Sequence, residues 1–195
     1  MHVVGFTRME DGTKEEYEFL HGLEVAYARG IADRVLDYFR GLENTFEGYA
    51  VTRQEHGLQT ATRALRDGAD EEMVVAALLH DIGDALAPCN HSEFAAALLR
   101  PYVSDRTYWI IKYHGVFQAF YYAHHLGGDR NERDRYRDHP NYQATVDFCE
   151  RWDQASFDPD YDTLPLDHFE PMVRRIFARE PFGSWRDSDG ATPPG

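Results

Sequence analysis

The chain has 195 residues, of which 43% are hydrophobic and 14% aromatic, and this composition is that of one globular domain with a full core. Its formal net charge of -14 at pH 7 opposes association with phosphate backbones, so nucleic acid is not an expected partner. No apolar run approaches the roughly 20 residues of a membrane span, and the polar N-terminus lacks a signal-peptide core. Cys89 and Cys149 form no CxxC motif or disulfide framework, which favours a reduced, cytoplasmic protein.

Apolar residues recur at helical spacing almost throughout the chain, and no stretch has the pattern of a strand. The expected helices cover approximately residues 15–39, 52–67, 70–79, 90–99, 104–114, 141–153 and 166–178. Gly22 interrupts the rhythm of the first helix, and Gly41 supplies its stop signal. These elements predict an all-α helical bundle, and their uneven lengths favour irregular crossings over a regular four-helix arrangement.

Capping residues support several of these boundaries. Thr52, Asp70 and either Ser104 or Asp105 are candidate N-caps, because their side chains can accept a hydrogen bond from the first turn. The sequence Asn90–Glu93 has the spacing of a capping box. The caps divide the middle of the chain into short helices joined by tight turns.

Stretches rich in charge, glycine or proline mark the loops. Residues 127–140 contain two glycines and the basic run Arg130–Arg137, so we expect a solvated loop there. Residues 187–195 are rich in Gly, Pro and Ser, and we expect a frayed tail. The whole chain, residues 1–195, is therefore predicted to be a single domain with its core at about 48–178.

An adjacent His80 and Asp81 end the most apolar of the expected helices. A neutral imidazole binds one metal, whereas a carboxylate has two oxygens and can bridge two metals. Four further candidate ligands sit near other expected helix ends: His56, His91, His114 and Asp153. Six ligands suit a dinuclear centre that keeps open positions for substrate or oxygen, so the sequence predicts a metal site where these helix ends meet.

Each ligand taken alone has a simpler interpretation. A single histidine in a helix is usually a surface residue or a satisfied core residue, and Asp153 could be a helix C-terminal acid in a solvated turn. The 24 residues from His56 to His80 favour the metal interpretation, because they leave room for a helix, a short turn and an antiparallel return. Such a hairpin brings both imidazoles to the same end of the bundle.

Five stretches that carry these residues resemble the HD-domain superfamily, and together they span about residues 48–177. They are residues 55–61, 77–83, 91–93, 112–114 and 151–153. Most members of the superfamily are metal-dependent phosphohydrolases. The chain is more similar to the branch of diiron oxygenases that includes myo-inositol oxygenase and the organophosphonate-degrading HD oxygenases, because it supplies four His and two Asp ligands in the same order.

The resemblance implies a role for each ligand. His56, His80, Asp81 and Asp153 are expected to hold one iron, and Asp81, His91 and His114 the other, with Asp81 as the bridging, catalytic carboxylate. In this branch the cofactor is a mixed-valent Fe(II)/Fe(III) pair and O2 is the cosubstrate. A hydrogen atom is taken from a substrate carbon, and oxygenation leads to C–C or C–P cleavage.

Three positions depart from the anion-binding pattern of the branch. Asp84 replaces a basic or donor residue, Gln118 replaces a lysine of the phosphonate enzymes, and Tyr49 replaces a glutamate. Together with Phe46, they are the expected substrate-binding residues, and Asp84 with the aromatic rings suggests recognition of an ammonium group. The alternative is that Asp84 only caps or hydrogen-bonds the following loop.

The leading hypothesis is therefore an O2-dependent oxygenase that cleaves a C–P or C–C bond in a small polar molecule, with an amino- or trimethylammonium-bearing organophosphonate as the expected substrate. A phosphohydrolase acting on a small phosphate ester or nucleotide through a metal-bound hydroxide is the first alternative, and a catalytically silent metal-bearing domain is the second. The sequence assigns no role to His124 and His125 beyond a solvated helix end or a contact at the pocket rim, and it gives no oligomeric state.

Overall fold

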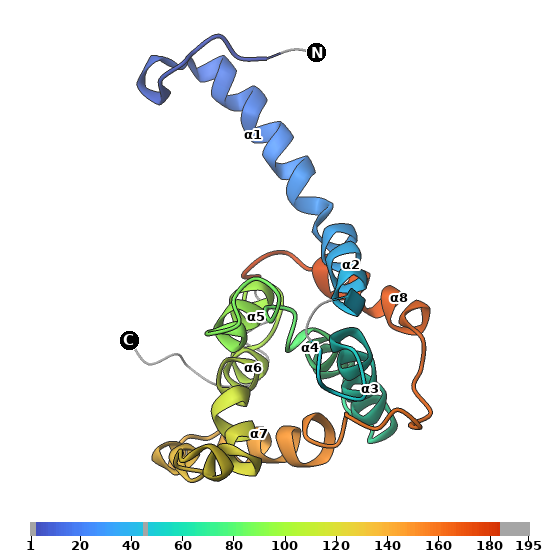
Figure 1. The fold of residues 1–195 in the computed structure, drawn as a ribbon. Helices are drawn as coiled ribbons and strands as arrows, with labels where there is room; N and C mark the ends of the chain where they lie inside the picture. The colour runs from blue at the N-terminus through green and yellow to red at the C-terminus, as the bar shows by residue number, and fades with distance from the viewer. Residues whose placement is uncertain (1–2, 45–46, 184–195) are drawn as a thin grey trace.

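The computed structural model describes residues 3–44 and 47–183, and their regular structure is entirely helical (Figure 1). The α-helices are α1 (Lys14–Arg29), α2 (Ile31–Gly41), α3 (Arg53–Arg66), α4 (Glu71–Leu79), α5 (His91–Leu99), α6 (Asp105–Gln118), α7 (Tyr142–Phe148) and α8 (Leu166–Phe177). Short 3-10 helices cover Met9–Asp11, Leu42–Asn44, Ala119–Tyr121, Ala123–Leu126 and Glu132–Tyr136, and Cys149–Asp153 forms a π-helical turn. The predicted all-α class is confirmed, whereas the predicted tail at 187–195 lies outside the described residues.

Helices α2 to α8 pack together into the body of the molecule, and α4 lies at its centre. Two acidic residues, Glu71 and Glu72, open α4, and every residue from Met73 to Leu79 is buried. It packs closely against α3, while α5 pairs with α6, and α2 and α8 cover the remaining side of the core. Seven successive buried positions require neighbours on all sides of a helix, which explains why α4 shows no polar face.

The predicted caps before α3, α4 and α6 are confirmed. Thr52 accepts from the backbone N–H of Glu55, and Glu55 accepts in return from the N–H of Thr52. Asp70 and Ser104 cap the other two helices through the N–H groups of their third residues. The capping box predicted at Asn90 is wrong, because the Asn90 side chain makes no cap hydrogen bond. Helix α5 nevertheless begins where predicted.

The first predicted helix is in fact two helices. The break falls at Gly30 and not at Gly22, because Gly30 is the residue where α1 ends and α2 begins. Helix α1 leaves the body and projects from it together with the preceding segment (Figure 1). No residue of α1 is buried, whereas α2 places Val35, Leu36 and Phe39 in the core.

The later part of the chain follows the expected order with shorter elements. The predicted helix at 141–153 is α7 followed by the π-helical turn, and the predicted loop at 127–140 contains one 3-10 helix, Glu132–Tyr136. Among the described residues, no helix is both long and apolar enough to cross a membrane.

Candidate metal centre

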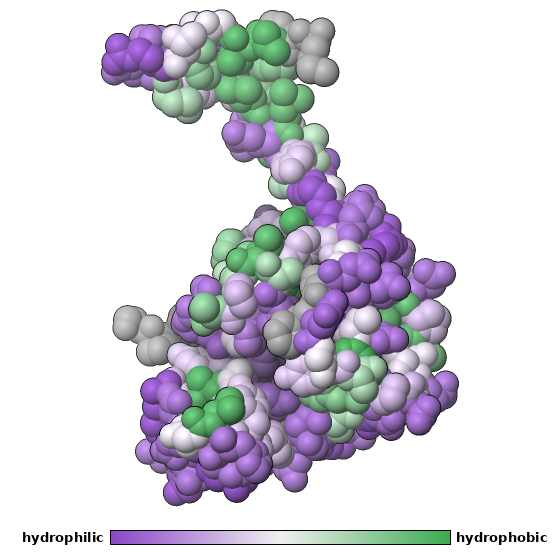
Figure 2. All heavy atoms as spheres, in the orientation of Figure 1, coloured by the Kyte–Doolittle hydropathy of each residue, from purple (hydrophilic) through white to green (hydrophobic). Residues whose placement is uncertain are grey.

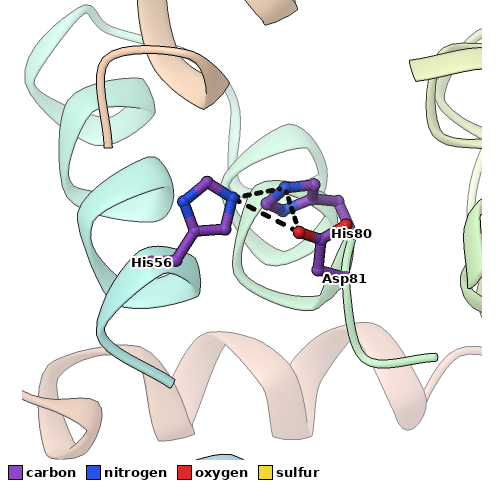
Figure 3. Close-up of side chains that lie close together, drawn as sticks. All are labelled: His56, His80 and Asp81. Atoms are coloured by element: carbon purple, nitrogen blue, oxygen red, sulfur yellow. Dashed lines mark hydrogen bonds and ion pairs between the residues drawn. The ribbon is translucent and has the colours of Figure 1, made fainter. Parts of the chain in front are cut away.

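Five separate elements deliver the six predicted ligands to one place. His56 lies in the first turn of α3, and His80 and Asp81 directly follow α4. His91 is the first residue of α5, His114 lies in α6, and Asp153 ends the π-helical turn. The tight α3–α4 hairpin brings His56 beside His80, as the spacing of the two residues predicts (Figure 3).

Asp81 lies between two groups of histidines and directs one carboxylate oxygen to each. Its Oδ2 is 3.4 Å from Nε2 of His56 and 3.5 Å from Nε2 of His80 (Figure 3). Its Oδ1 is 3.1 Å from Nε2 of His114 and 3.4 Å from Nε2 of His91. Two ligands bound at right angles to one metal at about 2.1 Å lie about 3.0 Å apart, so these separations suit shared coordination on either side of Asp81.

Asp153 completes the group around His56 and His80. Its Oδ1 lies 3.2 Å from Nε2 of His56 and 3.5 Å from Nε2 of His80. Its second oxygen, Oδ2, is buried and has no hydrogen-bond partner among the described residues. A buried carboxylate oxygen without a donor is costly unless a cation satisfies it.

Backbone carbonyls fix the orientation of three imidazoles. Nδ1 of His56 contacts the carbonyl of Ser156 at 2.9 Å, Nδ1 of His80 that of Ala77 at 2.8 Å, and Nδ1 of His114 that of Ile111 at 2.7 Å. A carbonyl only accepts, so each Nδ1 carries its proton, and Nε2 of the neutral ring presents a lone pair. The two Nε2 atoms of His56 and His80 then face each other at 3.1 Å, an arrangement that either a shared proton or a metal ion would stabilise.

The electrostatics of the cluster also favour a cation. Burial opposes a charge on His56, but hydrogen bonds and the charges of Asp153 and Asp81 raise its pKa to about 10. Burial likewise opposes ionisation of Asp153, yet the adjacent His80 and His56 hold the pKa of that carboxyl below its usual range. The site retains its carboxylates and attracts positive charge, and a metal would bind there by displacing protons.

These donors fit a dinuclear metal site at the helix ends. Three overlapping groups have ligand atoms within 4.8 Å of one another, and they are His56–His80–Asp81, His80–His114–Asp153 and Asp81–His91–His114. The first and third share Asp81, the residue expected to bridge two metals. Imidazole and carboxylate together suit iron, and they also suit zinc or manganese, so the donor set alone does not select the element.

Asp84 and Arg53 form an ion pair beside the ligands. Nε of Arg53 is 2.9 Å from Oδ2 of Asp84, and its Nη1 is 3.6 Å from Oδ2 of Asp81. The other oxygen of Asp84 is 3.3 Å from Nδ1 of His91, which orients that imidazole as a carboxylate behind a ligand does. Burial and the charge of Asp81 raise the pKa of Asp84. Sequence reasoning missed Arg53, although its position three residues before His56 places both on one helix face.

A cavity of about 300 Å³ opens onto the cluster. Its lining includes the ligands His56, Asp81, His91, His114 and Asp153, together with Arg53, Asp84, Gln118 and the rings of Tyr49, Tyr121, Tyr122 and Phe157. Three of the four expected substrate residues therefore face the cavity, and the fourth, Phe46, lies outside the described residues. His124, His125 and the run Arg130–Arg137 are absent from the described lining.

Gln118 and the aromatic rings hold fixed positions in this cavity. Nε2 of Gln118 donates to Oδ1 of Asp153 at 3.1 Å, so this residue supports a ligand. The ring of Tyr49 lies 5.0 Å from that of Phe157, and Phe157 stacks on His56 at 4.4 Å. The guanidinium of Arg53 lies 4.9 Å from the centre of the Tyr49 ring. Aromatic faces thus gather on one side of the metal cluster, with a cation and hydrogen-bonding groups beside them.

The helical body and its His/Asp cluster define an HD-domain protein. No family model matches the chain. The chain is 30% identical over 182 residues to the [1-hydroxy-2-(trimethylamino)ethyl]phosphonate dioxygenase (glycine-betaine-forming) of Leisingera caerulea, and the match covers 78% of this chain and 89% of that enzyme. The chain therefore belongs to the HD-domain dioxygenase family and is an enzyme, which confirms the resemblance inferred from the ligand motifs.

Proposed function

We propose that this enzyme uses O2 to cleave the C–P bond of a small organophosphonate that carries a quaternary ammonium group. The observation that carries the proposal is the cavity itself, where five of the six proposed metal ligands share the lining with aromatic rings and an arginine. The relative from Leisingera caerulea is named for a trimethylamino phosphonate and for glycine betaine as its product. A quaternary ammonium has no N–H to donate, so ring faces are a suitable receptor for it.

The proposed ligands divide into two groups around Asp81. His56, His80 and Asp153 would hold one iron on the Oδ2 side of Asp81, and His91 and His114 would hold the other on its Oδ1 side. When bound, a pair of irons supplies the redox chemistry that activates O2 and removes hydrogen from a substrate carbon. The protein contributes orientation, because carbonyl contacts fix three of the imidazoles and Asp84 fixes the fourth.

The two ends of the substrate are proposed to bind adjacent parts of the cavity wall, since the guanidinium of Arg53 lies 4.9 Å from the centre of the Tyr49 ring. Tyr49, Tyr122 and Phe157 receive the trimethylammonium group on their ring faces, which replaces the expectation that Asp84 pairs with it directly. Arg53 receives the phosphonate, since a guanidinium can bind two oxygens of an anion at once. Asp84 then acts through Arg53 and His91, with which it is already in contact.

The overall reaction balances with O2 as the only oxidant. A 1-hydroxy phosphonate and O2 give a carboxylate, inorganic phosphate and a proton. The carbon that carried the hydroxyl loses its bond to phosphorus and its hydrogen and becomes the carboxylate carbon. For a substrate in which a two-carbon chain joins the trimethylammonium nitrogen to phosphorus, that carboxylate is glycine betaine.

The test is turnover by iron-loaded enzyme with [1-hydroxy-2-(trimethylamino)ethyl]phosphonate. We expect equal amounts of O2 consumed, phosphate released and glycine betaine formed, with no turnover under argon. A matched substrate with a primary amine should have a higher KM, because a small ammonium gains less from ring faces. Phosphate release from a phosphate ester without O2, supported by Mn²⁺ or Mg²⁺, would instead indicate a phosphohydrolase.

A further inference from the structure

Gln118 is the last residue of α6 and lies in the wall of the cavity beside the metal cluster. The two atoms at the end of its amide have different surroundings. Nε2 donates a hydrogen bond to Oδ1 of Asp153 at 3.1 Å. Oε1 is buried and receives no hydrogen bond from the described residues. The side chain thus has a donor fixed on a proposed metal ligand and an acceptor that remains available to a bound molecule.

The orientation of this amide follows from the chemistry of Asp153. Half a rotation of an amide side chain exchanges its oxygen for its nitrogen, so the neighbouring groups decide between the two arrangements. A carboxylate that binds metal is ionised and only accepts hydrogen bonds, so it must face the NH₂ group. The reversed amide would place two acceptor oxygens in contact. Oε1 is therefore the atom that points away from Asp153.

A buried acceptor without a donor raises the free energy of the folded protein. Polar groups on the outer surface avoid this cost because water satisfies them, and the face of the body shown in Figure 2 is largely hydrophilic. Oε1 of Gln118 lies inside instead, in a wall that also contains the rings of Tyr121 and Tyr122. This position favours a bound molecule that brings an O–H or N–H group to the amide oxygen.

The proposed substrate contains one group that can be this donor. Its trimethylammonium nitrogen has no N–H, and the oxygens of an ionised phosphonate only accept hydrogen bonds. The hydroxyl on the carbon that carries phosphorus is therefore the hydrogen-bond donor of the molecule. Arg53 only donates, and the ring faces bind cations, so neither of these receptors recognises the proton of that hydroxyl.

We propose that Oε1 of Gln118 accepts a hydrogen bond from the substrate hydroxyl and thereby selects 1-hydroxy phosphonates over phosphonates that lack it. The inference rests on the proposed function and adds a specificity-determining residue to it. His114 lies four residues before Gln118 on α6, so the two side chains project from the same face of the helix. A hydroxyl in contact with Gln118 consequently lies beside the metal cluster, where the bond from its carbon to phosphorus is to be cleaved.

Binding measured without turnover tests the proposal. [1-hydroxy-2-(trimethylamino)ethyl]phosphonate and [2-(trimethylamino)ethyl]phosphonate, which differ only in the hydroxyl, are titrated calorimetrically into iron-loaded enzyme under argon. A mildly alkaline buffer keeps both phosphonates ionised. We expect the wild type to bind the hydroxylated compound more tightly by at least about 10-fold, since a buried group left unpaired disfavours the analogue that lacks its partner. Gln118→Met, which keeps the length of the side chain but has no amide oxygen, should reduce this preference by about 10- to 100-fold.

A second substitution separates recognition of the hydroxyl from support of Asp153. Gln118→Lys keeps an N–H donor for Asp153 but has no acceptor, so it should also lose the preference while retaining its metal, which mass spectrometry measures. A purely structural role would weaken both phosphonates equally and leave their ratio unchanged. Gln154→Met is the matched control, because the amide of Gln154 donates to the carbonyl of Glu150 and its oxygen is not a buried, unpaired atom.

The outcomes distinguish this inference from the proposed function. A wild type without preference, or an unchanged ratio in Gln118→Met and Gln118→Lys, would overturn the role of Gln118 and indicate that water supplies the donor to Oε1. The proposed function would stand in that case, because both phosphonates still bind. Failure of the wild type to bind either phosphonate would reject the proposed function and this inference with it.

Discussion

At the scale of single residues, the carboxylate of Asp81 is the group that links the two halves of the histidine cluster. Asp81 is the only described residue whose two oxygens face different groups of histidines, with His56 and His80 on one side and His91 and His114 on the other. Its pKa is held well below the usual range, because the neighbouring imidazoles outweigh the effect of burial. It is therefore ionised and available to two cations at once.

Removing that carboxylate should empty both metal positions. We expect Asp81→Ala to bind far less than one metal per chain after iron loading and desalting, against two for the wild type. Metal analysis by mass spectrometry measures this directly. The control is Asp129→Ala on an exposed loop, which should bind as the wild type does. Retention of one full equivalent by Asp81→Ala would count against a bridge.

Arg53 offers a second test at this scale. Because hydrogen bonds to charged groups contribute about 1.5–3 kcal/mol, Arg53→Gln should raise KM for the phosphonate by about 10- to 100-fold. Arg53→Lys should recover part of the loss, since it keeps the charge but not the paired N–H groups. Steady-state kinetics with metal content checked in parallel gives the answer, and Arg106→Gln, at an exposed position, is the control. An unchanged KM for Arg53→Gln would remove Arg53 from the proposed substrate site.

The clustering of the six candidate ligands could be predicted from the sequence, because each is marked by a local motif near a helix end. The ion pair of Arg53 with Asp84 could not be predicted, because the two residues are distant in the chain, although Arg53 lies on the face of α3 that carries His56. The contacts of Asp84 were likewise not visible in the sequence. Its chemistry suggested a receptor for a substrate cation, whereas the folded chain already provides Arg53 and His91 as neighbours.

At the scale of elements, the contact between α3 and α4 determines where His56 stands. Gly57 follows His56 and faces α4 so closely that a Cβ there would lie 2.6 Å from the carbonyl oxygen of Leu78 and 3.0 Å from the ring of Phe39. Backbone atoms on a buried helix have little freedom to move. Glycine at this position therefore allows the two helices to approach far enough for His56 to meet His80.

A methyl group at Gly57 should force the two helices apart. We expect Gly57→Ala to lower the free energy of unfolding by about 1–3 kcal/mol and to weaken metal binding, because overpacking displaces backbone. Gly41→Ala is the matched control, since no atom lies within 4 Å of a Cβ at that glycine. Denaturant titration of both variants measures the difference. Equal stability of the two variants would contradict the importance of this contact.

Glu72 joins three elements on the other side of the core. Its carboxylate accepts from the backbone N–H of Ser104 at 2.9 Å and from Arg179, and so ties α4 to the starts and ends of neighbouring helices. Burial opposes its charge, but hydrogen bonds from Ser104, Arg179 and Thr107 lower its pKa. Because the folded pKa lies below the unfolded one, the stabilisation is present above the usual pKa of 4.5 and is lost as the pH falls through the folded value.

Glu72→Gln should therefore destabilise the protein at neutral pH and much less in acid. We expect a loss of about 1–3 kcal/mol at pH 7, with the difference from wild type shrinking below pH 4.5. Denaturant titrations at several pH values measure it, and comparison of variant with wild type cancels the acid sensitivity of the metal site. The control is Glu132→Gln, whose pair with Arg135 is exposed. A pH-independent difference would show that the Glu72 charge contributes nothing.

Most element boundaries were predictable, because N-caps such as Thr52 and Asp70 act within one turn of helix. The break at Gly30 was not. Gly22 and Gly30 are equivalent as local signals, and only the anchoring of α2 in the core separates the two helices at the second glycine. For the same reason the projection of α1 away from the body had no signature in the sequence pattern.

At the scale of the whole molecule, the metal site connects the layers of the fold. Its proposed ligands come from α3, the turn after α4, α5, α6 and the π-helical turn. A ligand that binds only the folded state stabilises it by about 2.7 kcal/mol at 100 times its dissociation constant. Removing the metal should thus lower the melting temperature of the entire protein.

We expect iron-loaded enzyme to lose several degrees of Tm on treatment with a chelator, by an amount that grows with the free metal concentration beforehand. Differential scanning calorimetry measures the shift. The same chelator should leave the Tm of Asp81→Ala unchanged, since that variant has no metal to lose. A chelator effect of equal size in both proteins would mean that it acts somewhere other than at this site.

The wide separation of the ligands along the chain has a consequence for biosynthesis. His56 and Asp153 belong to the same group, although almost half of the sequence lies between them. A chain still emerging from the ribosome lacks Asp153 and the Ser156 carbonyl that orients His56 until 100 residues beyond His56 have been made. A metal would therefore meet this group of ligands only after the segment that carries Asp153 has folded against α3. The occupancy of the site would then depend on the metal available to the folded protein.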